Sequence, residues 1–128
     1  MNEFMLFIRA EGDPYADLSP EQQQQHVQKV SAYIENLLKT GKLKGSQPLE
    51  MEGVTISGSR GVFNDGPFNE SKEVIAGYYH ILAKDLREAV AIAKSDPRFD
   101  EGGWKIEVRP IRKVAGLVVY DGSWVTVS

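Results

Sequence analysis

The first half of the chain changes from a strand pattern to a helix pattern. Residues 3–10, EFMLFIRA, are rich in Phe and Ile and favour a buried strand. Residues 19–40 begin with Ser19 and Pro20, which suit the N-cap and first turn of a helix, and Gly41 is a suitable stop. Apolar side chains spaced three and four positions apart complete the helix pattern. They are Val27, Val30, Ile34, Leu37 and Leu38.

The second half of the chain contains turn signals between short strand patterns. Residues 49–66 hold two alternating runs separated by Gly and Ser, which predicts a β-hairpin. The β-branched and aromatic run near 75–84 predicts a central strand. Asp85 is a suitable cap for a second, shorter helix that Pro97 stops, and residues 104–114 predict another strand.

This order of elements is typical of an α+β domain. We expect a ferredoxin-like split βαβ arrangement in which both helices cover one face of a mainly antiparallel sheet. The other face must be solvated or buried against a second copy, so we expect a homodimer. Residues 115–128 contain Asp121-Gly122 between two β-rich runs, which predicts an added hairpin. We therefore divide the chain into an α+β domain at 1–114 and a hairpin extension at 115–128.

Composition and charge exclude several classes of protein. The formal charge is −3 and the basic residues are scattered, which argues against a nucleic-acid partner. The absence of cysteine excludes disulfides and cysteine-based zinc sites, and the two histidines lack metal-ligand spacing. We therefore expect no metal and no cofactor. The N-terminal apolar run is too short for a signal peptide or a membrane span, so we expect a cytoplasmic protein with no membrane partner.

Three stretches of the chain resemble one family. Residues 65–73 read DGPFNESKE, which resembles the DGPFAETKE motif of the DGPF branch of the YCII-related superfamily. Residues 77–97 resemble the strand and helix that follow this motif in the family, and IEVRPI at 106–111 resembles its closing strand. The chain departs from the motif at Asn69 and Ser71, where the family usually has Ala and Thr.

The resemblance covers residues 3–112, and the hairpin after Ala115 lies outside the family pattern. It implies a ferredoxin-like subunit that dimerises through its sheets into a dimeric α+β barrel. It also implies a cleft between helices, sheet and partner that can hold a small molecule. Members are often described as possible enzymes because a His and an Asp lie near that cleft. Some DGPF-type domains occur alongside extracytoplasmic-function sigma factors, and no reaction is settled for the family.

His26 and Asp65 are the candidate catalytic residues. His26 lies at the margin of the apolar stripe on the predicted helix and matches the His that the related branch carries there. A partly desolvated imidazole near a carboxylate can act as a general base at neutral pH. Asp65 heads the DGPF motif and can orient that imidazole or polarise a substrate. The alternatives are a packed or interfacial His26 bonded to a backbone carbonyl, and an Asp65 that only stabilises the turn.

Charged residues near the motif are candidate substrate-binding groups. Lys72 and Glu73 complete the motif, where they either line the cleft or form a solvated rim with local salt bridges. Arg109 can bind a substrate carboxylate through two hydrogen bonds. It can equally pair with Asp65 or Glu73 and hold the loop.

Aromatic residues and the second histidine complete the candidate substrate-binding set. Phe68 and Tyr78 suit the core and the pocket wall. His80 lies on the predicted central strand, where packing or an interface is the simpler interpretation. It is also the alternative base if His26 points to solvent.

Three functions are compatible with these residues. The first is a general acid–base enzyme, in which His26 moves a proton of a small molecule, Asp65 orients His26, and Arg109 or Lys72 holds negative charge. The second is a non-catalytic module that binds a small molecule in the same cleft. The third is a regulatory domain that binds a protein partner, with residues 116–128 as the candidate surface and sigma-factor control as the candidate process.

Overall fold

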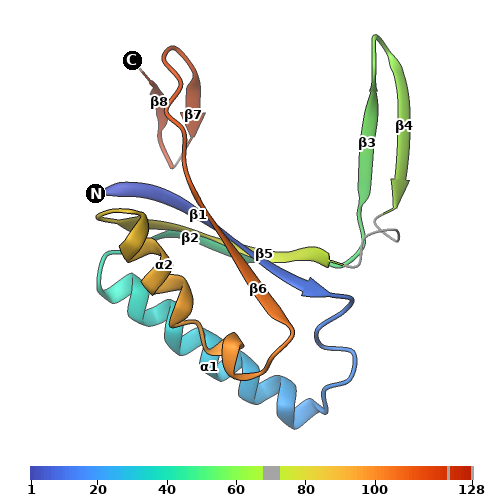
Figure 1. Ribbon diagram of the computed structural model, residues 1–128, viewed down its shortest axis with the longest axis vertical. Coiled ribbons are helices and arrows are strands. Elements are labelled where there is room, and N and C mark those ends of the chain that lie inside the picture. Colours follow the sequence, from blue (N-terminus) through green and yellow to red (C-terminus); the bar gives the residue numbers. More distant parts are fainter. Residues whose placement is uncertain (68–72, 121, 128) are drawn as a thin grey trace.

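The computed structural model describes residues 1–67, 73–120 and 122–127 (Figure 1). The chain folds as an α+β domain followed by a small C-terminal hairpin. Its helices are α1 (Pro20–Lys39), α2 (Leu86–Lys94) and the short 3₁₀ helix η2 (Pro97–Asp100). Its strands are β1 (Asn2–Glu11), β2 (Leu43–Pro48), β3 (Val54–Ser59), β4 (Val62–Pro67), β5 (Glu73–Ala83), β6 (Trp104–Pro110), β7 (Val118–Tyr120) and β8 (Trp124–Thr126).

Four strands form the main sheet, in the order β2-β5-β1-β6, and each neighbouring pair is antiparallel. Strands β1 and β2 are joined by α1 and separated in the sheet by β5, which is the split βαβ arrangement. Both helices lie on the same face of this sheet (Figure 1). The predicted ferredoxin-like α+β fold is therefore confirmed.

The alternation of buried and more exposed side chains along the two central strands, β1 and β5, shows which face the helices cover. Every second residue of β1 from Phe4 to Ala10 is buried, and β5 alternates in the same way from Gly77 to Ala83. These side chains pack against α1 and α2 because a strand presents alternate residues to one face. The core cluster consists of Phe4, Leu6, Ile8, Leu37, Tyr79, Ile81, Ala83, Ala89, Ile92 and Ala93.

Helix α1 has the predicted length, but its inward face is rotated from the predicted stripe. Its N-terminus is a capping box in which Ser19 and Gln22 each bond the backbone N–H of the other. Val27 and Leu38, which the prediction placed on the apolar face, are exposed. That part of the prediction is wrong, because the partly polar His26 and Tyr33 occupy the inward positions.

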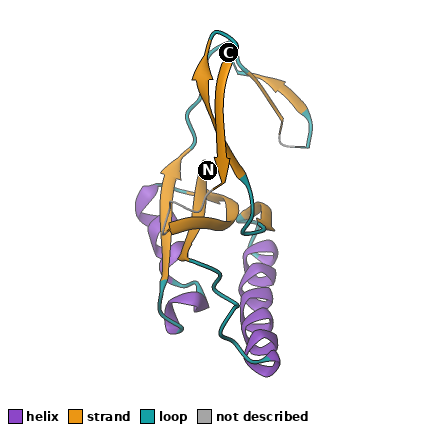
Figure 2. Cartoon of the chain, turned by 90° about the vertical axis from the view of Figure 1, so that its right-hand side faces the viewer, coloured by secondary structure: helices purple, strands orange, loops and turns teal. Residues whose placement is uncertain are grey.

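Strand β2 was not predicted, and the two hairpins do not join the main sheet. Its sequence LKGSQP lacks alternation, and it lies at the edge of the sheet with a register shift between Leu43 and Gly45. The predicted hairpins are present as the separate pairs β3–β4 and β7–β8. Both extend from the side of the sheet opposite the helices (Figures 1 and 2). No helix in the described part of the chain is long and apolar enough to cross a membrane.

Candidate functional site

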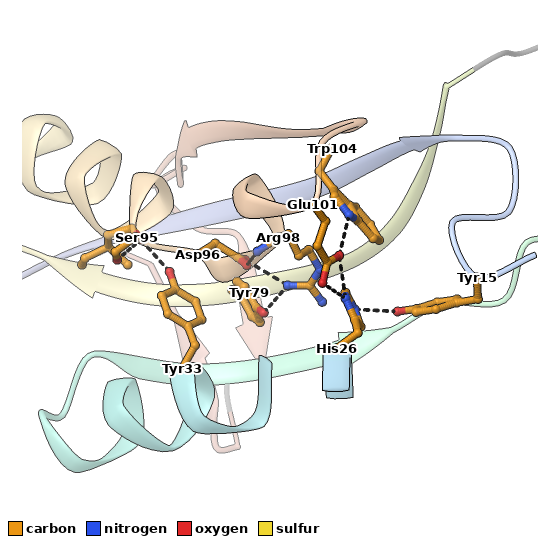
Figure 3. A network of polar contacts seen from close by, with 10 residues as sticks. Tyr15, His26, Tyr33, Tyr79, Ser95, Asp96, Arg98, Glu101 and Trp104 are labelled. Carbon is orange, nitrogen blue, oxygen red and sulfur yellow. Dashed lines mark hydrogen bonds and ion pairs between the residues drawn. The ribbon is translucent and has the colours of Figure 1, made fainter. Parts of the chain in front are cut away.

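A cluster of polar and aromatic side chains surrounds His26, near the N-terminal end of α1 (Figure 3). His26 is only 3% exposed. Its Nδ1 atom lies 2.7 Å from Oε2 of Glu101, which follows η2 in the chain. The indole of Trp104 stacks on the imidazole at a centroid distance of 5.7 Å, and its Nε1 donates to Glu101. The imidazole is therefore held both by a carboxylate and by an aromatic face.

The contact with Glu101 determines which imidazole nitrogen can act as a base. An ionised carboxylate only accepts hydrogen bonds, so Nδ1 carries the proton and donates it. The lone pair of a neutral His26 then lies on Nε2. Nε2 is 3.4 Å from the Tyr15 hydroxyl, which is at the long end of hydrogen-bond distances. A nitrogen held in this way can remove a proton from a bound molecule and return it.

His26 separates two clefts. One encloses about 370 Å³ and is lined mainly by polar residues, including Glu101 but not Tyr15. The other encloses about 180 Å³ and is lined by Tyr15 but not by Glu101. Tyr15, the partner of Nε2, lines the smaller cleft, and on this contact we assign the basic nitrogen to that cleft. In the part of the chain that the structure describes, no group of three His, Asp or Glu side chains could hold a metal ion.

Arg98 and Tyr79 line the inner end of the smaller cleft. Arg98 lies in η2 and is 8% exposed, and its Nη1 donates to the Asp96 carboxylate at 2.9 Å and to the Tyr79 hydroxyl at 2.7 Å. The guanidinium also lies over the rings of Tyr79 and Trp104. Burial lowers the pKa of Arg98, but Tyr79 and Asp96 outweigh burial and raise this pKa above its ordinary value. The guanidinium beside the cleft therefore stays protonated, and Asp96 is its counter-ion.

Of the predicted catalytic pair, only His26 belongs to this cluster. Asp65 is exposed on β4 and lies opposite Ile56 in the β3–β4 hairpin, which extends away from the helices (Figure 1). No hydrogen bond joins His26 to Asp65 among the described residues. The carboxylate at His26 is that of Glu101, a residue that the sequence analysis did not select.

The predicted substrate-binding residues on strands lie away from His26. Tyr78 and His80 are on β5, on the face of the sheet opposite the helices, because their neighbour Tyr79 is the buried residue. His80 Nε2 lies 2.8 Å from Oε1 of Glu3. Arg109 is exposed on β6, opposite Met5 of β1.

Glu73 is the predicted substrate-binding residue of the DGPF motif that lies within the described residues. Glu73, the first residue of β5, pairs with Lys105 of β6. This ion pair lowers the pKa of Glu73 and raises that of Lys105. The candidates Phe68 and Lys72 lie outside the described residues.

Three residues that the sequence analysis missed belong to the site. Glu101 and Arg98 lie in the segment between α2 and β6, and Tyr15 lies in the loop between β1 and α1. Their segments meet because Ala10, near the end of β1, pairs with Trp104 at the start of β6. These residues are thus brought together by the register between β1 and β6, which no local sequence motif encodes.

Comparison with known proteins gives the family of the chain. The model of the YCII-related domain matches residues 3–114, and the C-terminal hairpin lies outside this match. A search of curated proteins finds no match to the chain. Since the family match spans most of the sequence and the chain has the ferredoxin-like fold described above, the chain belongs to the YCII-related family.

Proposed function

We propose that this protein is an enzyme that moves a proton of a small molecule, with His26 as general base and then general acid. The observation that carries this proposal is the orientation of His26. Its Nδ1 is held at 2.7 Å by Glu101, and its Nε2 faces a small cleft. The DGPFNESKE motif also supports a narrower assignment to the DGPF branch of the family.

The proposed chemistry uses groups that are already in place. Nε2 takes a proton from the molecule bound in the cleft, and Glu101 stabilises the imidazolium that forms. Tyr15 lines the same cleft, so its hydroxyl is available to hydrogen-bond a bound molecule. His26 then returns the proton to another atom of that molecule. A positioned acid–base group of this kind contributes about 10²- to 10⁴-fold to a rate.

The first test of this proposal needs no substrate. ¹⁵N NMR of the two imidazoles identifies the nitrogen that carries the proton in each neutral histidine. We expect Nδ1–H for His26, because Nδ1 faces the Glu101 carboxylate. For His80 we expect Nε2–H, because Nε2 faces Glu3. A His26 that carries its proton on Nε2 would contradict the proposed role.

The second test measures proton transfer directly. Small carbon acids, including pyruvate and 2-oxobutyrate, are incubated with the protein in D₂O, and ¹H NMR follows the loss of their carbon-bound protons. His26→Gln should lower the protein-dependent rate by about 100-fold or more. His80→Gln makes the same chemical change on the other face and tests the alternative base. A loss of rate in His80→Gln but not in His26→Gln would mean that His80 is the base, and it would contradict the role proposed for His26.

We also propose that the open face of the sheet is buried against a second copy of the chain. Its central residues are half-buried and largely apolar, namely Met5, Phe7, Tyr78 and Leu82. Ion pairs lie among and beside them: His80, between Tyr78 and Leu82 on β5, pairs with Glu3, and Arg9 pairs with Glu107 of the edge strand β6. A cleft of about 610 Å³ continues from Phe7 and Tyr78 to Leu49 and Met51. Aromatic and other apolar side chains combined with paired polar groups are common in protein interfaces.

A further inference from the structure

We infer that the cleft beside His26 binds a small carboxylate, and that Arg98 is the group that holds it. This inference rests on the proposed function, because it assigns a class of substrate to the same site. Arg98 was absent from the sequence-based candidates. It is buried in η2 and lines the cleft. Figure 3 shows it within the network of polar contacts around His26.

Arg98 has hydrogen-bond donors that no described residue uses. Its Nη1 makes both bonds to the neighbouring groups, one to Asp96 and one to Tyr79. Its Nε is buried and has no hydrogen-bond partner among the described residues. Figure 3 shows the second terminal nitrogen, Nη2, on the side of the guanidinium that faces His26. A buried donor without an acceptor is unfavourable, so this arrangement favours an acceptor that is supplied from outside.

The unused donors have the geometry that a carboxylate fits. Nε and Nη2 form one edge of the planar guanidinium, and their N–H bonds run parallel. Nε is covered by neighbouring atoms, so a carboxylate first accepts from Nη2. A small shift of the covering side chains lets its second oxygen accept from Nε, which adds strength and fixes orientation. Asp96 and Tyr79 hold the opposite side of the group, so Arg98 is positioned before any ligand arrives.

The other walls of the cleft limit the size and polarity of the ligand. Arg98 is the one Lys, Arg, Asp or Glu side chain that lines it within the described residues. Ile8, Val30, Ile34 and Pro48 supply apolar surface. The volume of about 180 Å³ is well below the roughly 300–1,000 Å³ of sites for drug-sized ligands. These features favour a short molecule with a carboxylate at one end and an apolar body.

This placement also connects the ligand to the proposed chemistry. His26 and Arg98 line the same small cleft, and the basic Nε2 of His26 faces it. A carboxylate on Arg98 brings the carbon atoms next to it toward that nitrogen. Arg98 is thus proposed as the binding residue, and His26 remains the group that moves the proton.

The experiment uses propionate as the probe and propionamide as its uncharged analogue. ¹H–¹⁵N NMR follows the Nε–H signal of Arg98 while each compound is titrated into the intact protein, with sodium chloride as a control for ionic strength. We expect propionate to shift this signal in a saturable way and propionamide to leave it in place. An equal response to chloride or propionamide, or no response to propionate, would overturn the inference.

Two substitutions separate this inference from the proposed function. Arg98→Lys keeps the charge but loses the two-donor edge, so propionate should bind about tenfold to a hundredfold more weakly. Arg87→Lys, an exposed position on α2, is the matched control. His26→Gln should still bind propionate although it no longer transfers protons. If Arg98→Lys does not fold, the Nε–H titrations of wild type and His26→Gln decide the question alone.

The outcomes differ for the two proposals. Propionate binding at Arg98 with an Nε2–H tautomer of His26 would support the ligand class and contradict the catalytic role. The reverse result, an Nδ1–H tautomer and proton transfer without a carboxylate-dependent shift of Arg98, would leave the proposed function in place. It would overturn only the choice of a carboxylate held by Arg98.

Discussion

The two faces of the main sheet each carry a histidine paired with a glutamate. On the helix-covered face, His26 lies 2.7 Å from Glu101, and on the open face, His80 lies 2.8 Å from Glu3. The surroundings of the two pairs differ. The side chain of His26 is 3% exposed and stacks on Trp104, whereas that of His80 is 20% exposed. His26 borders the cleft that contains Arg98.

The glutamates of the two pairs also differ in their hydrogen-bond partners and surroundings. Glu3 accepts from both His80 and Lys44 on the surface of the sheet. Burial raises the pKa of Glu3, but these hydrogen bonds outweigh it and the pKa is lowered. Glu101 accepts from His26 and Trp104 and fixes a base beside a cavity. A His–Glu pair is therefore a candidate site only where an enclosed cleft lies at the other imidazole nitrogen.

The largest expected effect is a loss of stability when the buried ion pair between Asp96 and Arg98 is broken. This pair supports the helix-covered site. Asp96 is fully buried, caps η2 and pairs with Arg98, so Asp96→Asn leaves the guanidinium charge without its counter-ion. We expect the free energy of unfolding to fall by about 3–5 kcal/mol in a denaturant titration. Asp100→Asn, at an exposed position of the same 3₁₀ helix, is the matched control.

This substitution also tests the contrast between the faces. Because η2 leads directly into Glu101, its loosening should disturb the imidazole signals of His26 and leave those of His80 in place. If Asp96→Asn lowers the free energy of unfolding no more than Asp100→Asn does, the pair between Asp96 and Arg98 does not stabilise the site.

An intermediate effect is expected on the open face, where Phe7 lies at the centre of the proposed dimer interface. Phe7→Glu removes an apolar side chain from that surface and adds a charge. Burial of a Phe side chain is worth about 1.5–3 kcal/mol, so dimer dissociation should become about tenfold to a hundredfold easier. Leu38→Glu, an exposed apolar position of α1, should not change the mass measured by light scattering. A wild-type protein that is monomeric at micromolar concentration would refute the interface.

Much of the fold could be predicted because its signals are local. The cap at Ser19 and the alternation in β1 and β5 each depend on a few neighbouring residues, and the structure contains all of them. Strand β2 was not predicted, because LKGSQP has no alternation of apolar and polar residues and pairs only at the sheet edge. Its position depends on β5, which lies far from it in the sequence.

The site was harder to predict, because its residues meet only through tertiary structure. His26 could be selected from its place on the helix, but Glu101 and Arg98 lie in a connection without a recognisable motif. They reach His26 because β6 pairs with β1 in a register that sets Trp104 against Ala10. Asp65 attracted attention through its motif, yet β4 pairs with β3 rather than with a strand of the main sheet.

The smallest expected effect concerns Glu3 and depends on pH. Because the folded-state pKa of Glu3 is lowered from its ordinary value of 4.5, its contribution to stability is complete above that value. The contribution is lost as the pH falls through the folded pKa. At neutral pH, Glu3→Gln should cost less than about 1 kcal/mol, since the pair is partly exposed.

Urea titrations of wild type and Glu3→Gln across the acidic range test this sign. The difference in unfolding free energy between the two proteins should be largest near neutral pH and should shrink toward zero in acid. Glu35→Gln, an exposed position of α1, corrects for the loss of one surface charge. A difference that grows as the pH falls would mean that protonated Glu3 is the stabilising form. His80 and Lys44 would then not be the partners that keep this carboxylate ionised, and the open-face pair would be weaker than its 2.8 Å distance suggests.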